Sequence, residues 1–170
     1  DPNNKKNYRT RCSALISFDK TNVLIDTSPD LRHQLLRKKI NSIDTVLYTH
    51  FHADQTHGIN DLRVFYLKKQ KKITVYSDKL TAKYLYDNFS YCFVKKYDYP
   101  AILSLKPLKK NFTIGGINKN INIKPIKIKH GLIDSIAYVI NKKIAYISDA
   151  NEFYKKDYDY FKGLKYLIID

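Results

Sequence analysis

The chain has 170 residues, of which 44% are hydrophobic and 14% aromatic. This length suits one domain, and the composition can bury a core, which excludes a disordered chain. The formal net charge of +15 attracts anionic partners such as phosphate esters or RNA, although a composition biased toward Lys, Asn, Ile and Tyr is the competing explanation. No apolar run approaches the roughly 18 residues that span a bilayer, so no membrane partner is expected.

The first half of the chain predicts strands and helices in alternation. Residues 12–18 and 22–26 have strand character on either side of a tight turn. The Ser28-Pro29-Asp30 segment is typical of a helix start, because each residue type suits its place in a first helical turn. Leu31, Leu35 and Leu36 then predict one apolar side for a helix over 29–38. The elements expected next are a strand at 45–49, a helix at 61–69, a strand at 73–76 and a helix at 80–89.

The second half of the chain predicts mainly strands, at residues 102–105, 121–128, 136–140 and 143–147. Residues 120–124 alternate polar and apolar side chains, which predicts a strand with one buried face and one solvent-facing side. Glycines 115 and 116 and residues 141–142 predict turns. The sequence shows no internal repeat and no long linker, so the pattern favours one layered α/β domain.

Both ends of the sequence predict a piece excised from a longer protein. The chain contains no Met, opens at Asp1, and stops within the apolar run 166–170, which predicts a buried strand. We therefore expect residues 1–170 to form a single domain that is truncated at both ends. Cys12 and Cys92 have neither CxxC nor zinc-finger spacing, and two reduced thiols fit a cytoplasmic protein.

Five side chains that could bind a metal follow predicted strands. His50 and His52 are two residues apart at the end of strand 45–49, so their imidazoles can point to the same side and share one ion. Asp54 comes two residues later in a predicted loop, where a carboxylate can take a second metal or hold a water. His130 and Asp149 follow two further predicted strands. Because α/β proteins usually place their chemistry at such strand ends, these five residues predict a metal site.

Simpler interpretations exist for each histidine. A lone His-x-His pair is most often incidental, and only the accompanying Asp54, His130 and Asp149 favour a metal site. His33 lies between charged and polar neighbours, which predicts a surface position. His57 is expected to pack against the following helix or beside the metal ligands rather than to be one of them.

Residues 48–63, with the sequence YTHFHADQTHGINDLR, resemble the signature of metallo-β-lactamase-fold hydrolases. The resemblance is strongest to the PhnP-type cyclic phosphodiesterases and more distant to RNase Z, and residues 9–13, 25–32 and 146–149 support it. It implies an αββα four-layer sandwich with the site at one edge between two sheets. The resemblance further implies that a first zinc ion is bound by His50, His52 and His130, a second by Asp54, and both by Asp149, with manganese or iron as alternatives.

Two departures from the family pattern affect the second metal. The family motif HxHxDH ends in a histidine, and here Gln55 takes that position. An amide oxygen is a poor, neutral ligand compared with imidazole, so the sequence leaves open whether the site binds one metal ion or two. The family's glycine-rich opening loop and its last metal-binding histidine are expected beyond the two ends of the chain.

The function that the resemblance implies is metal-dependent hydrolysis of a small anionic phosphodiester, a cyclic phosphate or RNA. His50, His52 and Asp54 would be the catalytic residues, and a metal-activated hydroxide the nucleophile. Arg63 is a candidate for attracting the substrate, although the sequence alone does not place it in the site. Two alternatives stay open, namely a thioester or ester hydrolase of the same fold and a degenerate domain that binds nucleic acid without catalysis. A homodimer is also left open.

Overall fold

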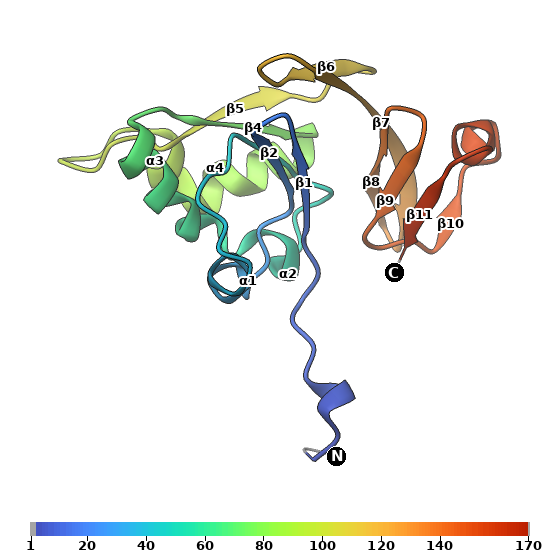
Figure 1. The fold of residues 1–170 in the computed structure, drawn as a ribbon, viewed down its shortest axis with the longest axis horizontal. Helices are drawn as coiled ribbons and strands as arrows, with labels where there is room; N and C mark the ends of the chain where they lie inside the picture. Colours follow the sequence, from blue (N-terminus) through green and yellow to red (C-terminus); the bar gives the residue numbers. More distant parts are fainter. Residues whose placement is uncertain (1–2, 170) are drawn as a thin grey trace.

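The computed structural model describes residues 3–169, which form two β-sheets, with α-helices beside the first sheet and a 3-10 helix beside the second (Figure 1). The first sheet has the strand order β1-β2-β3-β4-β5. Its strands are β1 (Ala14–Phe18), β2 (Thr21–Ile25), β3 (Thr45–Leu47), β4 (Ile73–Ser77) and β5 (Leu103–Pro107). β1 and β2 form the predicted hairpin, whereas β2 to β5 pair in parallel. Parallel pairing brings the carboxyl ends of β2, β3 and β4 to the same edge of the sheet.

The second sheet has the order β10-β7-β8-β9-β11, and β6 pairs with β7 outside this path. Its strands are β6 (Phe112–Gly115), β7 (Asn120–His130), β8 (Ile133–Ile140), β9 (Ile144–Ile147), β10 (Glu152–Phe153) and β11 (Tyr166–Ile169). The polar and apolar alternation at the start of β7 is confirmed, because Ile121 and Ile123 are buried while Asn120 and Asn122 are exposed. β11 pairs in parallel with β9, and the other neighbours are antiparallel.

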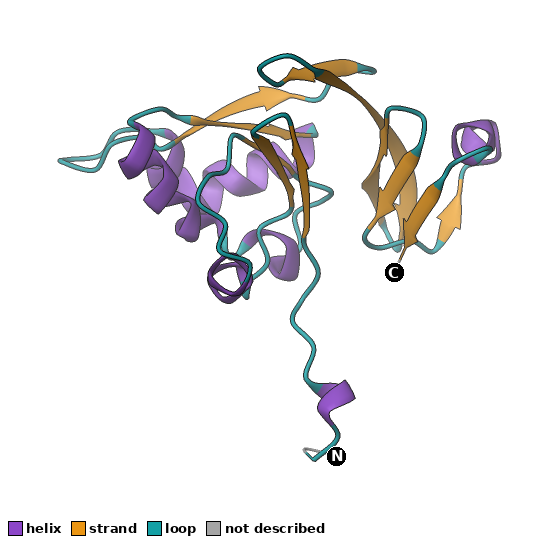
Figure 2. Ribbon diagram, in the orientation of Figure 1, coloured by secondary structure: helices purple, strands orange, loops and turns teal. Residues whose placement is uncertain are grey.

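Three α-helices cover the face of the first sheet that points away from the second (Figure 2). They are α1 (Leu31–Arg37), α3 (Arg63–Lys69) and α4 (Lys79–Phe93). The short α2 (Ala53–Thr56) lies at the edge of the sheet. The 3-10 helices are η1 (Lys5–Asn7), η2 (Ile59–Leu62) and η3 (Lys155–Phe161). No helix within residues 3–169 has both the length and the apolar character to cross a bilayer.

Three apolar cores separate the layers. The first joins helix residues such as Phe65 and Leu85 to Val46 and Val75 of the first sheet. The second lies between the two sheets, and the third lies on the outer face of the second sheet. Phe153, Phe161 and Leu164 pack on that outer face, so the 3-10 helix η3 and its flanks provide the fourth layer within the described residues. The predicted layered sandwich is confirmed in this form.

The first helix differs from its predicted form in two ways. α1 begins at Leu31, two residues later than expected, and Asp30 at its N-cap makes no side-chain capping bond. The Ser28 hydroxyl accepts a hydrogen bond from the backbone N–H of Asp30 in the turn before the helix. Leu31 and Leu35, which are one helical turn apart, are buried, but Leu36 is 65% exposed. The prediction that Leu36 lies on the apolar side was therefore wrong, since the next residue is rotated about 100° around the helix axis.

The predicted buried strand at 166–170 exists but is not buried. β11 is an edge strand, and its four side chains are 48% to 54% exposed, because only β9 pairs with it and no other described element covers it. Asp170 lies outside the described residues. Four further elements were not predicted from the sequence, namely the short α2, β6, β10 and η3. Asp54 consequently lies in the first turn of α2, and not in the loop that was predicted there.

Candidate metal centre

Three histidine side chains from two sheets meet at the carboxyl edge of the parallel strands. His50 and His52 follow β3 and precede α2, and His130 is the last residue of β7 (Figure 1). One ring nitrogen from each of the three lies within 4.8 Å of the other two. The ring centroids are 4.5 Å apart for His50 and His52, 4.9 Å for His50 and His130, and 5.0 Å for His52 and His130. Nδ1 of His52 and Nε2 of His130 are 3.3 Å apart, and small rotations of the rings would bring all three nitrogens to the roughly 2.0–2.1 Å at which zinc binds imidazole.

His50 is held by a buried network of hydroxyl groups. Its Nδ1 lies 3.0 Å from the Thr49 hydroxyl, which donates to Asp26 at 2.8 Å and accepts from Ser148 at 3.0 Å. When Thr49 gives its single proton to Asp26, Nδ1 of His50 becomes the donor to Thr49 and Nε2 presents a lone pair. His50 is only 1% exposed, and Nε2 has no hydrogen-bond partner within residues 3–169. A buried nitrogen left without a partner is what a metal ligand looks like before the ion is added, so the residues fit a divalent cation.

A carboxylate completes this side of the site. Asp149 follows β9, and its Oδ2 lies 3.4 Å from Nε2 of His50. An ion pair at that distance would need a protonated His50, and the lowered pKa of His50 excludes this at neutral pH. The contact instead places a carboxylate oxygen beside the nitrogen that faces the other two histidines.

The buried Asp26 favours positive charge nearby. Burial raises its pKa to about 8, although the hydrogen bonds from the Thr49 backbone and hydroxyl oppose this rise. A cation bound at the histidines would stabilise the ionised carboxylate. Asp26, Thr49 and Ser148 lie in segments that carry the family resemblance, but the sequence predicted no role for any of them. The available signal was that Asp26 and Ser148 follow buried strands, as the histidines do.

Metal-free protein should lose stability in acid because of His50. The pKa of His50 is lowered to about 4, first by burial and then by the neighbouring His52 and His130. Between that value and about 6.5, the unfolded chain binds a proton at this residue and the folded chain does not, so stability falls as the pH falls. We expect a loss of up to about 3 kcal/mol of unfolding free energy from this residue across that range.

Urea denaturation of metal-free protein at pH 7, 6, 5 and 4 measures this loss. His50→Asn is the control, because its amide N–H can donate to Thr49 but does not titrate. The variant should show a shallower decline below pH 6.5. Parallel curves for the two proteins would show that His50 is not buried in its neutral form.

Asp54 and Gln55 lie beside the histidines in α2. The Gln55 amide nitrogen donates to Oδ2 of Asp54 at 3.0 Å and to Oδ2 of Asp149 at 3.2 Å. α2 is fixed against the end of β2, because Gly58 donates its backbone N–H to the Thr27 carbonyl at 2.8 Å. A Cβ at Gly58 would lie 2.0 Å from the Ser28 carbonyl oxygen, so only glycine permits this approach. The metal-binding roles predicted for Asp54 and Asp149 stay predictions.

The other sequence candidates lie outside this cluster. His33 is exposed, as expected, and His57 packs on α4 through Tyr84 and Phe89. The Arg63 guanidinium lies 4.5 Å from the centroid of the Tyr99 ring, and so it is engaged there. Both cysteines are free thiols.

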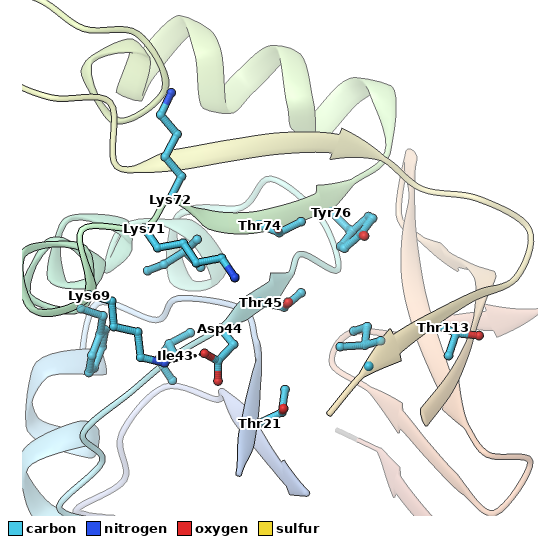
Figure 3. A pocket seen from close by; sticks show the side chains of 14 residues that line it. Thr21, Ile43, Asp44, Thr45, Lys69, Lys71, Lys72, Thr74, Tyr76 and Thr113 are labelled. Atoms are coloured by element: carbon cyan, nitrogen blue, oxygen red, sulfur yellow. Dashed lines mark hydrogen bonds and ion pairs between the residues drawn. The ribbon is translucent and has the colours of Figure 1, made fainter. Parts of the chain in front are cut away.

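A pocket of about 340 Å³ lies at the opposite end of the parallel strands (Figure 3). Its lining includes Thr45, the first residue of β3, whereas the histidines follow the last residue of that strand. The Lys69 ammonium group at its rim pairs with Asp44 at 2.6 Å. None of the three histidines lines this pocket, so the pocket is not part of the candidate metal centre.

The family of the chain follows from its sequence as well as its site. A β-lactamase superfamily domain matches residues 21–170, which is most of the chain. The chain belongs to the β-lactamase superfamily. This agrees with the resemblance of the His-x-His-x-Asp segment, and the superfamily domain includes all five residues that the sequence analysis selected.

Similar proteins support this assignment at different levels. An octanoyltransferase of Porphyromonas gingivalis is 31% identical over 163 residues, which are 95% of this chain and 32% of that protein. A diphosphatase from the PhnP family superposes with a TM-score of 0.81 at 27% identity, over 94% of this chain and 59% of that one. Human tRNase Z, short form, has a TM-score of 0.65 at 14% identity over 90% of this chain and 68% of that one, and it shows the fold alone. This chain thus spans about a third of the length of the octanoyltransferase and about three fifths of the length of the diphosphatase.

Proposed function

We propose that this superfamily chain is the catalytic part of a metal-dependent hydrolase that cleaves a phosphate ester or a related phosphate bond. The observation that carries the proposal is the meeting of His50, His52 and His130 around the unpartnered Nε2 of His50. A divalent cation bound there would polarise a phosphoryl oxygen and lower the pKa of a water to about 7. Zinc suits three imidazoles and a carboxylate, and manganese and iron accept the same donors.

The chain's own residues would position the reactants. Thr49 and Asp26 fix the ring of His50, so that its Nε2 lone pair would be available to a bound cation. The Asp149 carboxylate lies beside that nitrogen and can accept a proton or a hydrogen bond from water. Asp54 lies at the exposed rim of the same cluster, where it can orient a water molecule for attack.

The phosphate substrate is supported by similarity and by charge. The diphosphatase of the PhnP family is similar over most of this chain. The net charge of +15 attracts anions over long range. Lys127 and Lys129, near His130 on β7, are each paired with an acidic side chain, so the attraction comes from the overall charge of the chain more than from these two groups.

A second candidate is hydrolysis of an acyl ester or thioester. The similarity to a protein named octanoyltransferase favours it, because acyl transfer and acyl hydrolysis begin at the same type of carbonyl. The chain matches only a third of that protein, however, and the rest can carry the transferase activity. We therefore rank this candidate below the phosphate ester.

Paired assays on the full-length, zinc-loaded protein test the two candidates. One uses bis-p-nitrophenyl phosphate and the other p-nitrophenyl octanoate, each before and after removal of zinc by a chelator. Zinc-dependent cleavage of the phosphodiester alone supports the first candidate. Zinc-dependent cleavage of the octanoate alone supports the second. Cleavage of neither, together with zinc-independent binding of RNA, would favour a non-catalytic domain.

A further inference from the structure

The Gln55 side chain bridges two carboxylates by hydrogen bonds. It is fully buried, and its amide nitrogen donates to Asp54 at 3.0 Å and to Asp149 at 3.2 Å. An amide nitrogen carries two hydrogens, and both are used here. These two hydrogen bonds also fix the orientation of the amide. If the amide were turned over, its oxygen would face two carboxylates and no hydrogen could be donated between them.

The position of that nitrogen is the position expected of a cation. Two carboxylates that share a site repel one another unless a cation or a set of donors lies between them. Here the donors come from Gln55, and no ion is required to hold Asp54 and Asp149 together. The same Oδ2 of Asp149 lies 3.2 Å from the amide nitrogen and 3.4 Å from Nε2 of His50, so one carboxylate oxygen contacts both the amide and His50.

A second cation would have to displace this amide and would gain little in return. The nitrogen offers no lone pair, and the Cys12 sulfur lies 3.7 Å from both the amide oxygen and the amide nitrogen. The backbone of Gln55 is also fixed, because its carbonyl accepts from the Thr27 N–H at 2.7 Å and its N–H donates to the His52 carbonyl at 3.1 Å. The backbone at Gln55 therefore cannot move away without disturbing α2.

We propose that the chain binds one divalent cation, at His50, His52 and His130, and that the Gln55 amide takes the place of a second one. Gln55 is then a positioning residue that holds Asp149 toward His50. Asp54 in turn is a partner of Gln55 and not a metal ligand. This inference rests on the proposed metal centre and defines how many ions that centre holds.

Counting zinc in the full-length protein tests the inference without measuring activity. The protein is dialysed against excess zinc, passed through a desalting column, and analysed by mass spectrometry of its metal content. We expect one zinc per chain. Two zinc ions per chain would overturn the inference and leave the metal centre intact. No zinc at all would overturn the proposed metal centre itself.

Two substitutions at Gln55 test the role of the amide. Gln55→His supplies a lone pair between the same carboxylates and should raise the zinc content to two per chain. Gln55→Leu removes the donors without adding a ligand and should leave the content at one or lower. Gln70→His is the matched control, because it adds a histidine at an exposed position and should leave one zinc per chain.

Circular dichroism confirms that each variant is folded before its zinc is counted. A folded Gln55→His protein that still binds one zinc would show that the amide is not what keeps a second ion out. If that variant does not fold, the zinc content of the unmodified protein still decides between one ion and two.

Discussion

Replacing His50 with alanine is expected to abolish zinc binding and hydrolysis together. His50 supplies the buried, unpartnered nitrogen around which the other two histidines gather. Loss of a residue that only supports a metal ligand typically weakens metal binding by about 10–100-fold, and loss of a ligand should exceed that range. Competition with a chromogenic chelator measures the zinc affinity, and the phosphodiester assay measures turnover.

Two controls separate this effect from general damage. His33→Ala removes an exposed histidine from α1 and should leave both zinc affinity and turnover unchanged. Thermal unfolding of metal-free His50→Ala shows whether the cavity left by the ring has unfolded the site. A folded His50→Ala protein that keeps zinc at the affinity of the unmodified chain would exclude the proposed centre.

The sequence predicted the location of the site because that location follows from strand direction. Parallel strands end at one edge, and polar residues that follow such strands meet there. His50 and His52 could be selected on that ground, whereas His130 ends a strand of the antiparallel second sheet and was selected only because it follows a predicted strand; the structure brings the three together. The alternation of residues 120–124 predicted the start of β7 for a similar reason, because a strand repeats every two residues.

The sequence could not predict the contacts that join distant parts of the chain. Gln55 and Asp149 are 94 positions apart, so their hydrogen bond depends on how the two sheets pack. In the sequence Gln55 was only a weak ligand, whereas the structure shows a donor to two acids. Ser148 is 99 positions from Thr49, and its role beside His50 was hidden in the same way.

Burial was predicted less well than secondary structure. An apolar run such as β11 predicts a strand, but its exposure depends on which elements lie beside it, and β11 lies at a sheet edge. Leu36 was assigned to the buried side of α1 from its residue type, although its helical position faces solvent. For β11 the tertiary environment decided the outcome, whereas for Leu36 the helix geometry itself places the side chain on the solvent side.

Thr49→Val should destabilise the protein and weaken its zinc site at the same time. Valine has nearly the shape of threonine but no hydroxyl, so three buried groups lose a partner, namely Asp26, Ser148 and Nδ1 of His50. Asp26 keeps its hydrogen bond from the backbone N–H of residue 49, but each buried polar group left without a partner costs about 1–3 kcal/mol, and we expect a total loss of about 3–5 kcal/mol in unfolding free energy. Zinc affinity should fall by about 10–100-fold, because the ring of His50 is no longer held.

Thr49→Ser is the control for this prediction, because it keeps the hydroxyl and removes only a methyl group. It should retain most of the zinc affinity and lose less stability than the valine variant. Urea denaturation of metal-free protein measures stability, and chelator competition measures affinity. Equal zinc affinity in the valine and serine variants would show that the ring of His50 is oriented by packing alone, and the hydroxyl network would then serve the fold without serving the metal.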